Sequence, residues 1–486
     1  MFAFAALLAL AALPQDPTHL AATATNAFAV DLYQQLAEKP DGNLFLSPWS
    51  IATVLTMATE GARGETAAEM RRVLHLPEGP LADVHASIAS LREQLATAAG
   101  TATAETRKRI ADLRIQLAAR TAEYEAAHAK DPTGDTGDAA AAVDAIADEL
   151  RALLAATSCY ELQSAQSLWF DHSVQPVPAF TKALEHFYVA GMQRVDFCGA
   201  SEAARLRVNA WVADRTAQKI PELIQPGRLS AGTRFLIVNA THFRGEWVSP
   251  FVEGETSPSE FTKANGTKVA IQLMHDANLN KARFAAFTST GEFFATPRFQ
   301  SMRPRKVTPI APAAGGFQIA ALPYRGDRLE FVVLLPDAPD GLTRLEQLVK
   351  TERLPQWLAR LERRAIDFAL PRFELQCRFQ LKESLQALGM RRAFQVTGGQ
   401  CAQFDGIAIA ETLRAESVTH MACIEVNEKG TEAVAATTIG GTAIGLAPEP
   451  VKPVFRADRP FLFLIRDHKS GVVLFLGRVV DPEMEK

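Results

Sequence analysis

A long run of small and β-branched residues near the C-terminus limits what this chain can fold into. Between Lys429 and Lys452 the sequence contains no Lys or Arg, and from Gly430 to Ala443 almost every side chain is small. Gly and Ala alone would be typical of a flexible linker, but the Thr, Val and Ile residues among them favour a β-strand. We therefore predict an extended segment that is able to become a strand.

At the two-residue period of a strand, this segment has two different faces. One face carries Thr431, Ala433, Ala435, Thr437 and Ile439, and the other carries Glu432, Val434, Ala436 and Thr438. The first face has no charged side chain, so it is fit for burial inside a sheet.

The rest of the chain mixes helical and strand patterns without the regular βαβ alternation of a parallel-sheet protein, and no internal repeat is visible. Apolar residues at every fourth position from Phe28 to Leu36 predict a helix that stops at Lys39-Pro40. Buried strands with a turn at Asp467–Gly471 are predicted for Thr233–Asn239, Leu329–Leu335, Phe461–Ile465 and Val472–Val480. The fold class that we predict is α+β.

Length, charge and cysteine usage set further limits. At roughly 150 residues per domain, a chain of 486 residues suggests about three domains. The net charge of −4 gives no electrostatic case for a nucleic-acid or membrane partner. Five widely spaced cysteines form no Cys-x-x-Cys pair and have no His at metal spacing. We expect neither a disulfide framework nor a metal site, and no cofactor.

The first residues form an unbroken apolar run. Residues 2–13 end at Pro14 and are typical of the hydrophobic part of a secretory signal. A bilayer span needs about 20 residues, so we expect no membrane anchor. Ala9-x-Ala11 offers a cleavage site, although no Lys or Arg precedes the run. We expect residues 1–13 to be a signal segment and the protein to be secreted.

Two stretches differ in composition from the rest. From about Leu91 to Thr157, two apolar stripes flank a polar DPTGDTGD turn, which predicts a hairpin of two antiparallel helices. The cations at Arg107–Arg109 fit a solvated helical face better than an anion site. The second stretch, at about 277–316, interleaves Phe with Arg and is predicted to be a basic aromatic loop. It contains no recognisable nucleic-acid motif.

Motifs of common enzyme classes do not occur in the sequence. There is no Gly-x-Ser-x-Gly elbow, no His-Glu-x-x-His, no phosphate-binding Gly-rich loop and no Gly-x-Gly-x-x-Gly. A catalytic triad is defined by geometry and not by sequence order, so its absence is not proved. We nevertheless expect that the protein is not an enzyme.

Several segments resemble the serpin family. EVNEKGTEAVAAT and FRADRPFLFLIRDHKSGVVLFLGRVVDPE are similar to the serpin hinge and C-terminal signature. Further similar segments are NLFLSPWSIATVLTMATEGARGET, FLIVNATHFRGEWVSPF, ALPYRGDRLEFVVLLPD and FALPRFELQCRFQLKESLQALGM. The resemblance runs from about Asn26 to Glu483. It implies one serpin domain over 18–486, with three β-sheets, surrounding helices, an exposed reactive-centre loop, and insertions at about 91–157 and 277–316.

Serpins inhibit serine or cysteine proteases as suicide substrates. The protease forms an acyl-enzyme on a bait bond, and the cleaved loop inserts into the large sheet as an extra strand. The resemblance therefore implies a monomeric inhibitor that forms a covalent complex with its protease. The implied hinge comprises Glu428, Gly430, Thr431, Glu432, Ala433, Val434, Ala435 and Ala436. The alternatives are a non-inhibitory serpin acting as a chaperone or ligand carrier, and a secreted hydrolase.

The resemblance also assigns single positions. Ser47, Ser50, Asn239 and His420 match the polar cluster where the sheet must part, and Trp247 matches the aromatic residue where insertion begins. Counting from the hinge places the bait bond at Ile444-Gly445, whereas counting back from Phe455 places it near Leu446-Ala447. Every candidate is apolar. The sequence departs from the family at Gln218, where Gly is more common.

Overall fold

The computed structural model describes residues 18–38, 42–99, 160–188, 191–295, 315–326, 328–395, 401–409, 413–431 and 452–483, with scattered positions between 105 and 153. The expected signal segment at 1–13 lies outside the described residues. The same holds for the hinge beyond Thr431 and for both candidate bait bonds.

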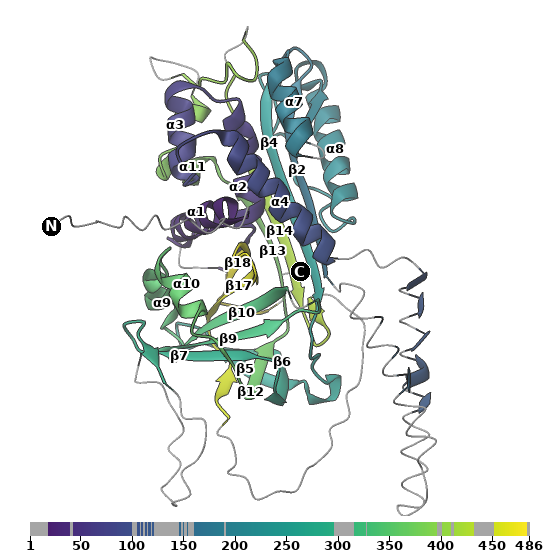
Figure 1. The fold of residues 1–486 in the computed structure, drawn as a ribbon, viewed down its shortest axis with the longest axis vertical. Helices are drawn as coiled ribbons and strands as arrows, with labels where there is room; N and C mark the ends of the chain where they lie inside the picture. The colour runs from purple at the N-terminus through teal and green to yellow at the C-terminus, as the bar shows by residue number, and fades with distance from the viewer. Residues whose placement is uncertain are drawn as a thin grey trace, which may run out of the picture.

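Helices and three β-sheets make up the described part of the chain (Figure 1), which confirms the α+β prediction. The α-helices are α1 (His19–Ala37), α2 (Pro48–Glu60), α3 (Gly64–Val73), α4 (Leu81–Ala99), α7 (Pro178–Phe187), α8 (Phe197–Arg215), α9 (Leu342–Leu348), α10 (Arg353–Leu358) and α11 (Lys382–Ala387). Short 3₁₀ helices are η1 (Glu253–Glu255) and η2 (Arg392–Phe394).

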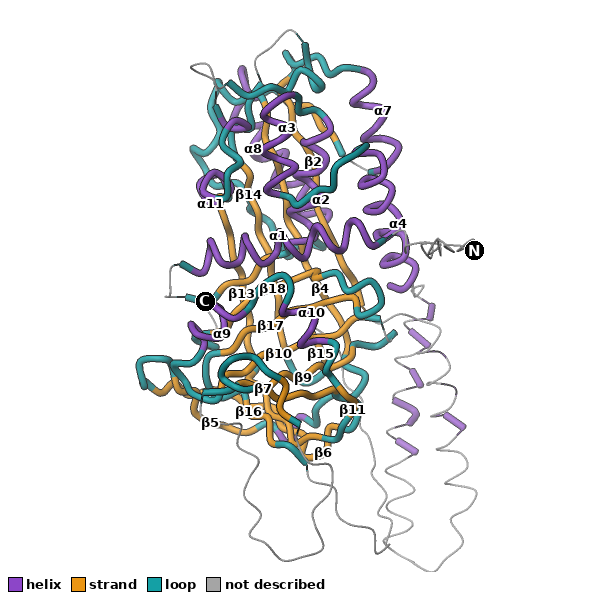
Figure 2. The backbone as a smooth tube through the Cα atoms, turned by 60° about the vertical axis from the view of Figure 1, so that its left-hand side comes forward, coloured by secondary structure: helices purple, strands orange, loops and turns teal. Residues whose placement is uncertain are grey.

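Sheet A, as we name it, has the strand order β13-β14-β4-β2-β3, and β15 pairs with β4. Its strands are β2 (Tyr160–Asp171), β3 (Met192–Val195), β4 (Phe235–Glu246), β13 (Phe373–Gln380), β14 (Val418–Val426) and β15 (Gly430–Thr431). The long strands of sheet A run along the long axis of the molecule, and α1 lies across their direction (Figures 1 and 2).

The second sheet, sheet B, follows the order β1-β18-β17-β10-β9-β7-β11, with β8 paired to β7. Its strands are β1 (Leu44–Leu46), β7 (Arg283–Phe287), β8 (Phe293–Phe294), β9 (Phe317–Pro323), β10 (Leu329–Pro336), β11 (Glu362–Arg363), β17 (Phe461–Asp467) and β18 (Val473–Val479). The third, sheet C, has the order β16-β12-β6-β5. Its strands are β5 (Ser257–Thr262), β6 (Lys268–Leu279), β12 (Ile366–Pro371) and β16 (Val454–Arg456).

The predicted helix and strands are present in the structure. The stripe that begins at Phe28 forms α1, in which Phe28 and Leu32 are fully buried. The four predicted strand runs lie in β4, β10, β17 and β18, and Asp467–Gly471 forms the turn between the last two. The four strands are buried along nearly their whole length, as their continuous apolar runs predict.

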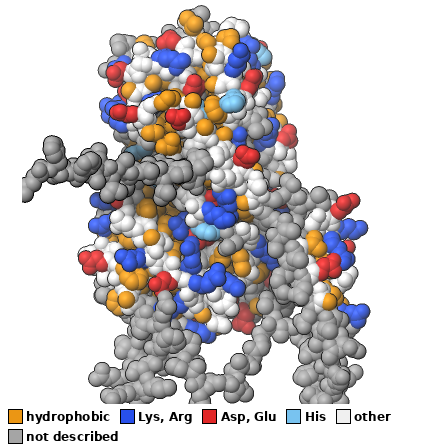
Figure 3. Space-filling view, viewed as in Figure 1, with side chains coloured by type: hydrophobic (Ala, Val, Ile, Leu, Met, Phe, Trp, Pro, Cys, Tyr) orange, Lys and Arg blue, Asp and Glu red, His pale blue; other side chains and the backbone are white. Residues whose placement is uncertain are grey.

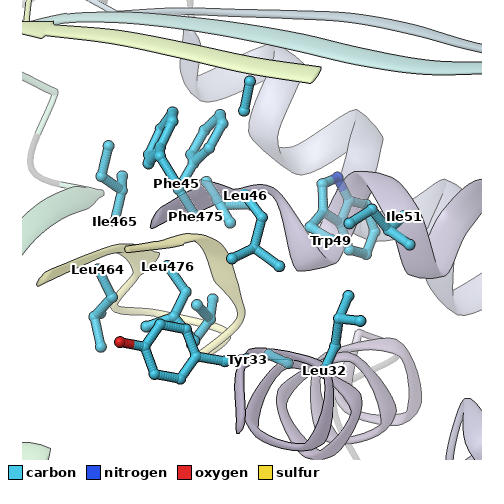
Figure 4. Packing of buried hydrophobic residues seen from close by; sticks show 14 of the residues in the cluster. Leu32, Tyr33, Phe45, Leu46, Trp49, Ile51, Leu464, Ile465, Phe475 and Leu476 are labelled. Carbon is cyan, nitrogen blue, oxygen red and sulfur yellow. The ribbon is translucent and has the colours of Figure 1, made fainter. Parts of the chain in front are cut away.

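The main hydrophobic core joins sheet B to α1 and α2. Phe45 of β1 stacks on Phe475 of β18 with ring centroids 5.1 Å apart, while Tyr33 and Leu32 of α1 close the core from the other side (Figure 4). Sheet A has this core on one face and α8 on the other, where Val208 packs in a second cluster. Opening sheet A would therefore disturb two cores at once.

The structure corrects the boundaries of both unusual stretches. Residues 91–99 continue α4, and Leu91 and Leu95 are buried in the main core, so this part belongs to the helix that precedes the unusual stretch. In the second stretch, Phe284 and Phe287 are buried in β7, and the stretch also supplies the end of β6 and all of β8. Phe284 and Phe287 are therefore core residues of sheet B and not part of a loop, whereas Phe294 is partly buried and Phe293 is exposed. Residues 296–314 lie outside the described part.

Scattered described positions in the remaining insertion bring its two apolar stripes together. Leu113 is buried against Ile146 and Leu153, and Arg109 forms an ion pair with Glu149 at 2.5 Å. These contacts are those that an antiparallel helical hairpin makes.

Candidate functional site

The hinge begins in a tight turn that reverses the chain after β14. The backbone N–H of Asn427 donates to the carbonyl of Gly430 at 2.9 Å, and the N–H of Gly430 donates back at 3.2 Å. The Asn427 side chain also accepts from the N–H of Lys429, which is a typical Asx turn. The chain therefore passes from β14 through this turn directly into β15.

In β15, the strand that follows this turn, the residues pair in antiparallel fashion with the end of β4. Gly430 lies opposite Glu246, and Thr431 lies opposite Gly245. Gly430 has φ of 152°, and a Cβ atom at this position would overlap the backbone carbonyl of Gly245. A glycine is needed here because the two backbones approach more closely than any side chain allows.

The carboxylate of Glu428 anchors the turn. It is only 3% exposed, and it accepts hydrogen bonds from Arg372 at 2.6 Å and from the Thr256 hydroxyl. Burial by itself raises the pKa of Glu428, but the hydrogen bonds from Arg372 and Thr256 outweigh it and hold this pKa below its usual value. A buried charge therefore holds the turn to Thr256, directly after η1, and to Arg372, between β12 and β13.

Trp247 clamps the same turn from the end of β4. Its indole N–H donates to the carbonyl of Asn427 at 3.0 Å, and its backbone N–H donates to the carbonyl of Lys429 at 3.1 Å. The ring is buried and stacks on Tyr324 with centroids 4.6 Å apart. The predicted aromatic residue thus lies where β15 starts.

Beyond the hinge, β14 and β4 lie side by side only along part of their length. Their parallel pairing runs from Val418 opposite Ile237 to Cys423 opposite His242 and then ends. From this point β4 continues to Glu246, where β15 pairs with it. We call the paired part the seam. Sheet A is closed along the seam and already parted at the hinge end.

The predicted polar cluster occupies the seam. His420 on β14 lies opposite Asn239 on β4, and its Nδ1 is 2.5 Å from the Asn239 Oδ1. Its Nε2 accepts from the backbone N–H of Ser47 at 3.1 Å, so the proton of the neutral ring is on Nδ1. The Ser47 hydroxyl donates to the carbonyl of Leu474 at 2.8 Å. The seam is thereby tied to α2 and sheet B.

Burial determines the charge of His420. The side chain is fully buried, and burial lowers its pKa to about 3. The imidazole is therefore neutral over the physiological pH range, and its role is structural.

Ser50 is the centre of a wider network than the sequence predicted. Its hydroxyl is hydrogen-bonded at 2.8 Å to Asn239, to Thr241 of β4 and to Gln166 of β2. We did not predict Thr241 and Gln166. Thr241 follows Asn239 by two residues and so shares its face, a signal that could have revealed it. Gln166 carries no such signal.

The chain that follows the predicted reactive loop joins sheet C. β16 is a strand of three residues that runs parallel to β12, and Phe455 at its centre is fully buried. Its ring stacks on Phe368 with centroids 5.1 Å apart. The loop is thus fixed to one sheet at its start and to another at its end.

Gln218, the departure from the family pattern, follows α8. Gln218 has φ of 63° and Ala217 has φ of 49°, a left-handed region that costs residues with a Cβ atom roughly 1 kcal/mol or more each. Glycine adopts this conformation without strain, which gives a physical reason for the family preference.

Comparisons with known proteins identify the family. The model described as "Serpin (serine protease inhibitor)" matches residues 23–117 and 96–482. The chain belongs to the serpin family. Among its relatives, the leukocyte elastase inhibitor of Bos taurus is 30% identical, over 94% of this chain and 98% of the relative. Human serpin B3 is 28% identical, over 94% of this chain and 98% of the relative.

Solved structures agree on the fold. The structure matches that of uncleaved ovalbumin with a TM-score of 0.68 and 22% identity, over 95% of this chain and 99% of that chain. It matches the structure of maspin with a TM-score of 0.70 and 22% identity, over 96% of this chain and 100% of that chain. The predicted serpin fold is confirmed.

The expectation of secretion is wrong. The chain is similar to serpin B3 and to leukocyte elastase inhibitors along nearly their whole length, and these relatives point away from secretion. Residues 2–13 lack the preceding positive charge that a secretory signal carries, so their apolar character alone was a weak indicator. No helix in the described part of the chain is long and apolar enough to cross a membrane.

Proposed function

We propose that this serpin inhibits a protease as a suicide substrate, by inserting its cleaved loop into sheet A. The observation that carries the proposal is β15, two residues of strand already paired where β14 and β4 have parted. β15 is antiparallel to β4, as a strand returning from β14 by a hairpin turn must be. Insertion then requires only that β15 lengthen towards the seam.

The register of β15 predicts the partner of each inserted residue. Continuing from Thr431 opposite Gly245 places Glu432 opposite Arg244 and Ala433 opposite Phe243. Directly opposite residues of an antiparallel pair share a face. Phe243 is buried in the main core, so the charge-free face predicted from the sequence would enter that core.

The outward face is matched in charge. Glu432 would lie beside Arg244, so the charge in this part of the hinge would meet an opposite one. Farther along the inward, charge-free face, Thr437 would lie opposite Asn239, in the place now taken by His420. A small hydroxyl at that point replaces one polar partner of Asn239 by another. The sequence of the loop thus suits the sheet that would receive it.

The chemistry belongs to the protease. Its nucleophile attacks the carbonyl of the bait residue, the peptide bond breaks, and the new amine leaves with a proton while the bait residue becomes an ester of the enzyme. Insertion of the freed strand, at about 3.3 Å per residue, carries the attached protease roughly 50 Å. A catalytic triad displaced by even 1 Å loses activity, so the ester persists as a covalent one-to-one complex with the monomeric inhibitor.

The bait region favours proteases with an apolar primary pocket. We propose Ile444-Gly445 as the bait bond, with Leu446-Ala447 as the alternative, because the hinge fixes the inserted length. No Lys or Arg occurs between Lys429 and Lys452. The primary pocket of a trypsin-type protease contains a buried acidic residue that pairs with Lys or Arg. In this region such a pocket would find no cation to pair with.

The test incubates the full chain with elastase, chymotrypsin, subtilisin and trypsin and looks for gel-stable covalent complexes. We expect complexes with at least one of the first three and a released C-terminal peptide that begins at Gly445. A protease whose catalytic Ser is replaced by Ala is the control and should give no complex. Complete cleavage by the active proteases without any complex would contradict the proposal and favour the carrier alternative.

A further inference from the structure

A cavity of about 220 Å³ lies beside sheet A, between α2, α4, β2 and α8. Trp49 and Met57 of α2, Leu95 of α4 and Leu162 of β2 contribute apolar walls. Gln166 of β2 also lines it. The cavity is larger than the roughly 150 Å³ that holds a benzene molecule in a protein core, so it has room for one aromatic ring and a short polar tail.

Two arginines from different helices line the same cavity. The guanidinium carbon of Arg92 on α4 lies 5.8 Å from the centroid of the Tyr188 ring, and that of Arg215 on α8 lies 5.4 Å from the Trp211 ring. All four residues line the cavity. The aromatic faces hold both cations in place by cation–π attraction. Within the described part of the chain, neither arginine has a carboxylate within ion-pair distance.

We propose that this cavity binds a small aromatic carboxylate. Its ring would lie against Trp49 and Met57, and its carboxylate would accept hydrogen bonds from Arg92, Arg215 or both. Guanidinium groups match the geometry of a carboxylate better than any other protein cation does. A cationic ligand would be repelled by two positive charges, and a neutral one would leave them unused.

Occupancy would act on sheet A through Gln166. This residue lines the cavity and donates to the hydroxyl of Ser50 at 2.8 Å, so it connects the ligand to the polar network at the seam. A ligand that contacts β2, α2 and α4 together stabilises the arrangement in which they are closed. This consequence, slower loop insertion, rests on the proposed function, whereas binding itself does not.

The binding experiment uses the uncleaved full chain and 3-phenylpropionate, with 3-phenylpropan-1-ol as the uncharged match. We expect saturable one-to-one binding of the acid by calorimetry and quenching of tryptophan fluorescence. The alcohol should bind at least fivefold more weakly. Equal binding of acid and alcohol, or no saturation by the acid, would overturn the proposal.

Two variants and one control locate the site. Arg92→Gln and Arg215→Gln should each weaken binding of the acid, with a combined loss of at least tenfold for the double variant, while leaving the alcohol unaffected. Arg207→Gln removes the same charge from the exposed side of α8, away from the cavity, and should change nothing. Unchanged affinity in the double variant would refute the site, whatever is found for protease inhibition.

Discussion

His420 of β14 and Asn239 of β4 are hydrogen-bonded at 2.5 Å across the seam that an inserting strand must enter. Counted from the hinge end of the seam, the bond lies at the fourth of six paired positions, so a strand that lengthens from β15 would reach it only after parting the first three. On the proposed mechanism, this hydrogen bond would therefore oppose the later part of insertion and not its start.

The first prediction concerns pH. Because burial lowers the pKa of His420 to about 3 in the folded protein, the unfolded chain, with its ordinary value near 6.5, binds more protons between these two values. Stability should therefore fall as the pH decreases from about 6.5, by up to about 1.4 kcal/mol per pH unit from this residue. Urea unfolding at pH 7 and pH 5 measures the slope.

In the His420→Gln variant this slope should be reduced. The exposed His172 provides the control, because replacing it with Gln should leave the pH dependence unaltered. An undiminished slope in His420→Gln would mean that other groups cause the acid sensitivity.

The second prediction concerns the anchor of the hinge. Glu428→Gln removes a buried charge, leaves the Arg372 guanidinium without its partner and should destabilise the uncleaved form by about 1–2 kcal/mol. The figure is below that for a fully buried pair because Arg372 is 44% exposed. Glu253→Gln is the matched control, since Glu253 forms an exposed ion pair with Lys429. Equal melting temperatures of Glu428→Gln and wild type would rule out an anchoring role.

The stabilising contribution of Glu428 also has a pH window. Its pKa is lowered in the folded state, so the contribution is complete above the ordinary value and is lost as the pH falls below it. The Glu428→Gln variant should approach the wild type in stability under strongly acidic conditions.

Different parts of this structure were predictable for different reasons. The helix from Phe28 and the strand from Leu329 follow from periodicity, since each buries one face or is fully buried. The seam residues came from the family resemblance alone, because Ser47 and His420 are far apart in sequence. The partner of Glu428 was not predictable, since Arg372 reaches it only through tertiary packing.

The basic aromatic stretch shows how the sequence misled us. Phe284 and Phe287 are separated by two small residues and preceded by Lys281 and Arg283, so neither a helical nor a strand period is complete. Their burial in β7 depends on the stacking of Phe287 on Phe317, with centroids 5.0 Å apart. Because this strand has only five residues and is buried by contact with an aromatic ring from a distant segment, its own sequence shows little strand pattern.

The third prediction concerns the inserting face. Thr431→Arg should convert the inhibitor into a substrate, because the register directs this residue to the core face and an unpaired guanidinium costs several kcal/mol to bury. Each 1.4 kcal/mol added to the insertion barrier slows insertion about tenfold. Hydrolysis of the acyl-enzyme then becomes faster than insertion, and the protease is released. Stoichiometry of inhibition is the measurement.

Thr431→Val is the matched control, since it keeps size and branching and should inhibit as the wild type does. Glu432→Arg would place its charge on the outward face and should be milder than Thr431→Arg. A wild-type stoichiometry for Thr431→Arg would show that the register of β15 does not continue into the loop.

The fourth prediction is a gain of stability on cleavage. A loop cut near Ile444 is free to add roughly ten or more ladder hydrogen bonds, at about 1 kcal/mol each, so the melting temperature should rise markedly. Scanning calorimetry before and after nicking measures it. Nicked Thr431→Arg should gain less, and an unchanged transition in the nicked wild type would mean that the loop stays outside the sheet.

The fifth prediction concerns the strained link after α8. Gln218→Gly relieves a left-handed conformation and should stabilise the protein by up to about 1 kcal/mol. Lys219→Gly, at the next position, has no such strain to relieve and should destabilise it. Denaturant midpoints compare the two, and a loss of stability in Gln218→Gly would contradict the assigned strain.

The burial of β16 in sheet C bears on how long the uncleaved protein would stay active. On the proposed mechanism, insertion of the uncleaved loop would require Phe455 to leave its fully buried position beside Phe368. Extracting such a ring exposes apolar surface at a cost of about 2–3 kcal/mol, before any lost hydrogen bonds are counted. If the proposed mechanism holds, spontaneous inactivation of the uncleaved protein would therefore be limited by the release of β16 from sheet C and not by the opening of the seam.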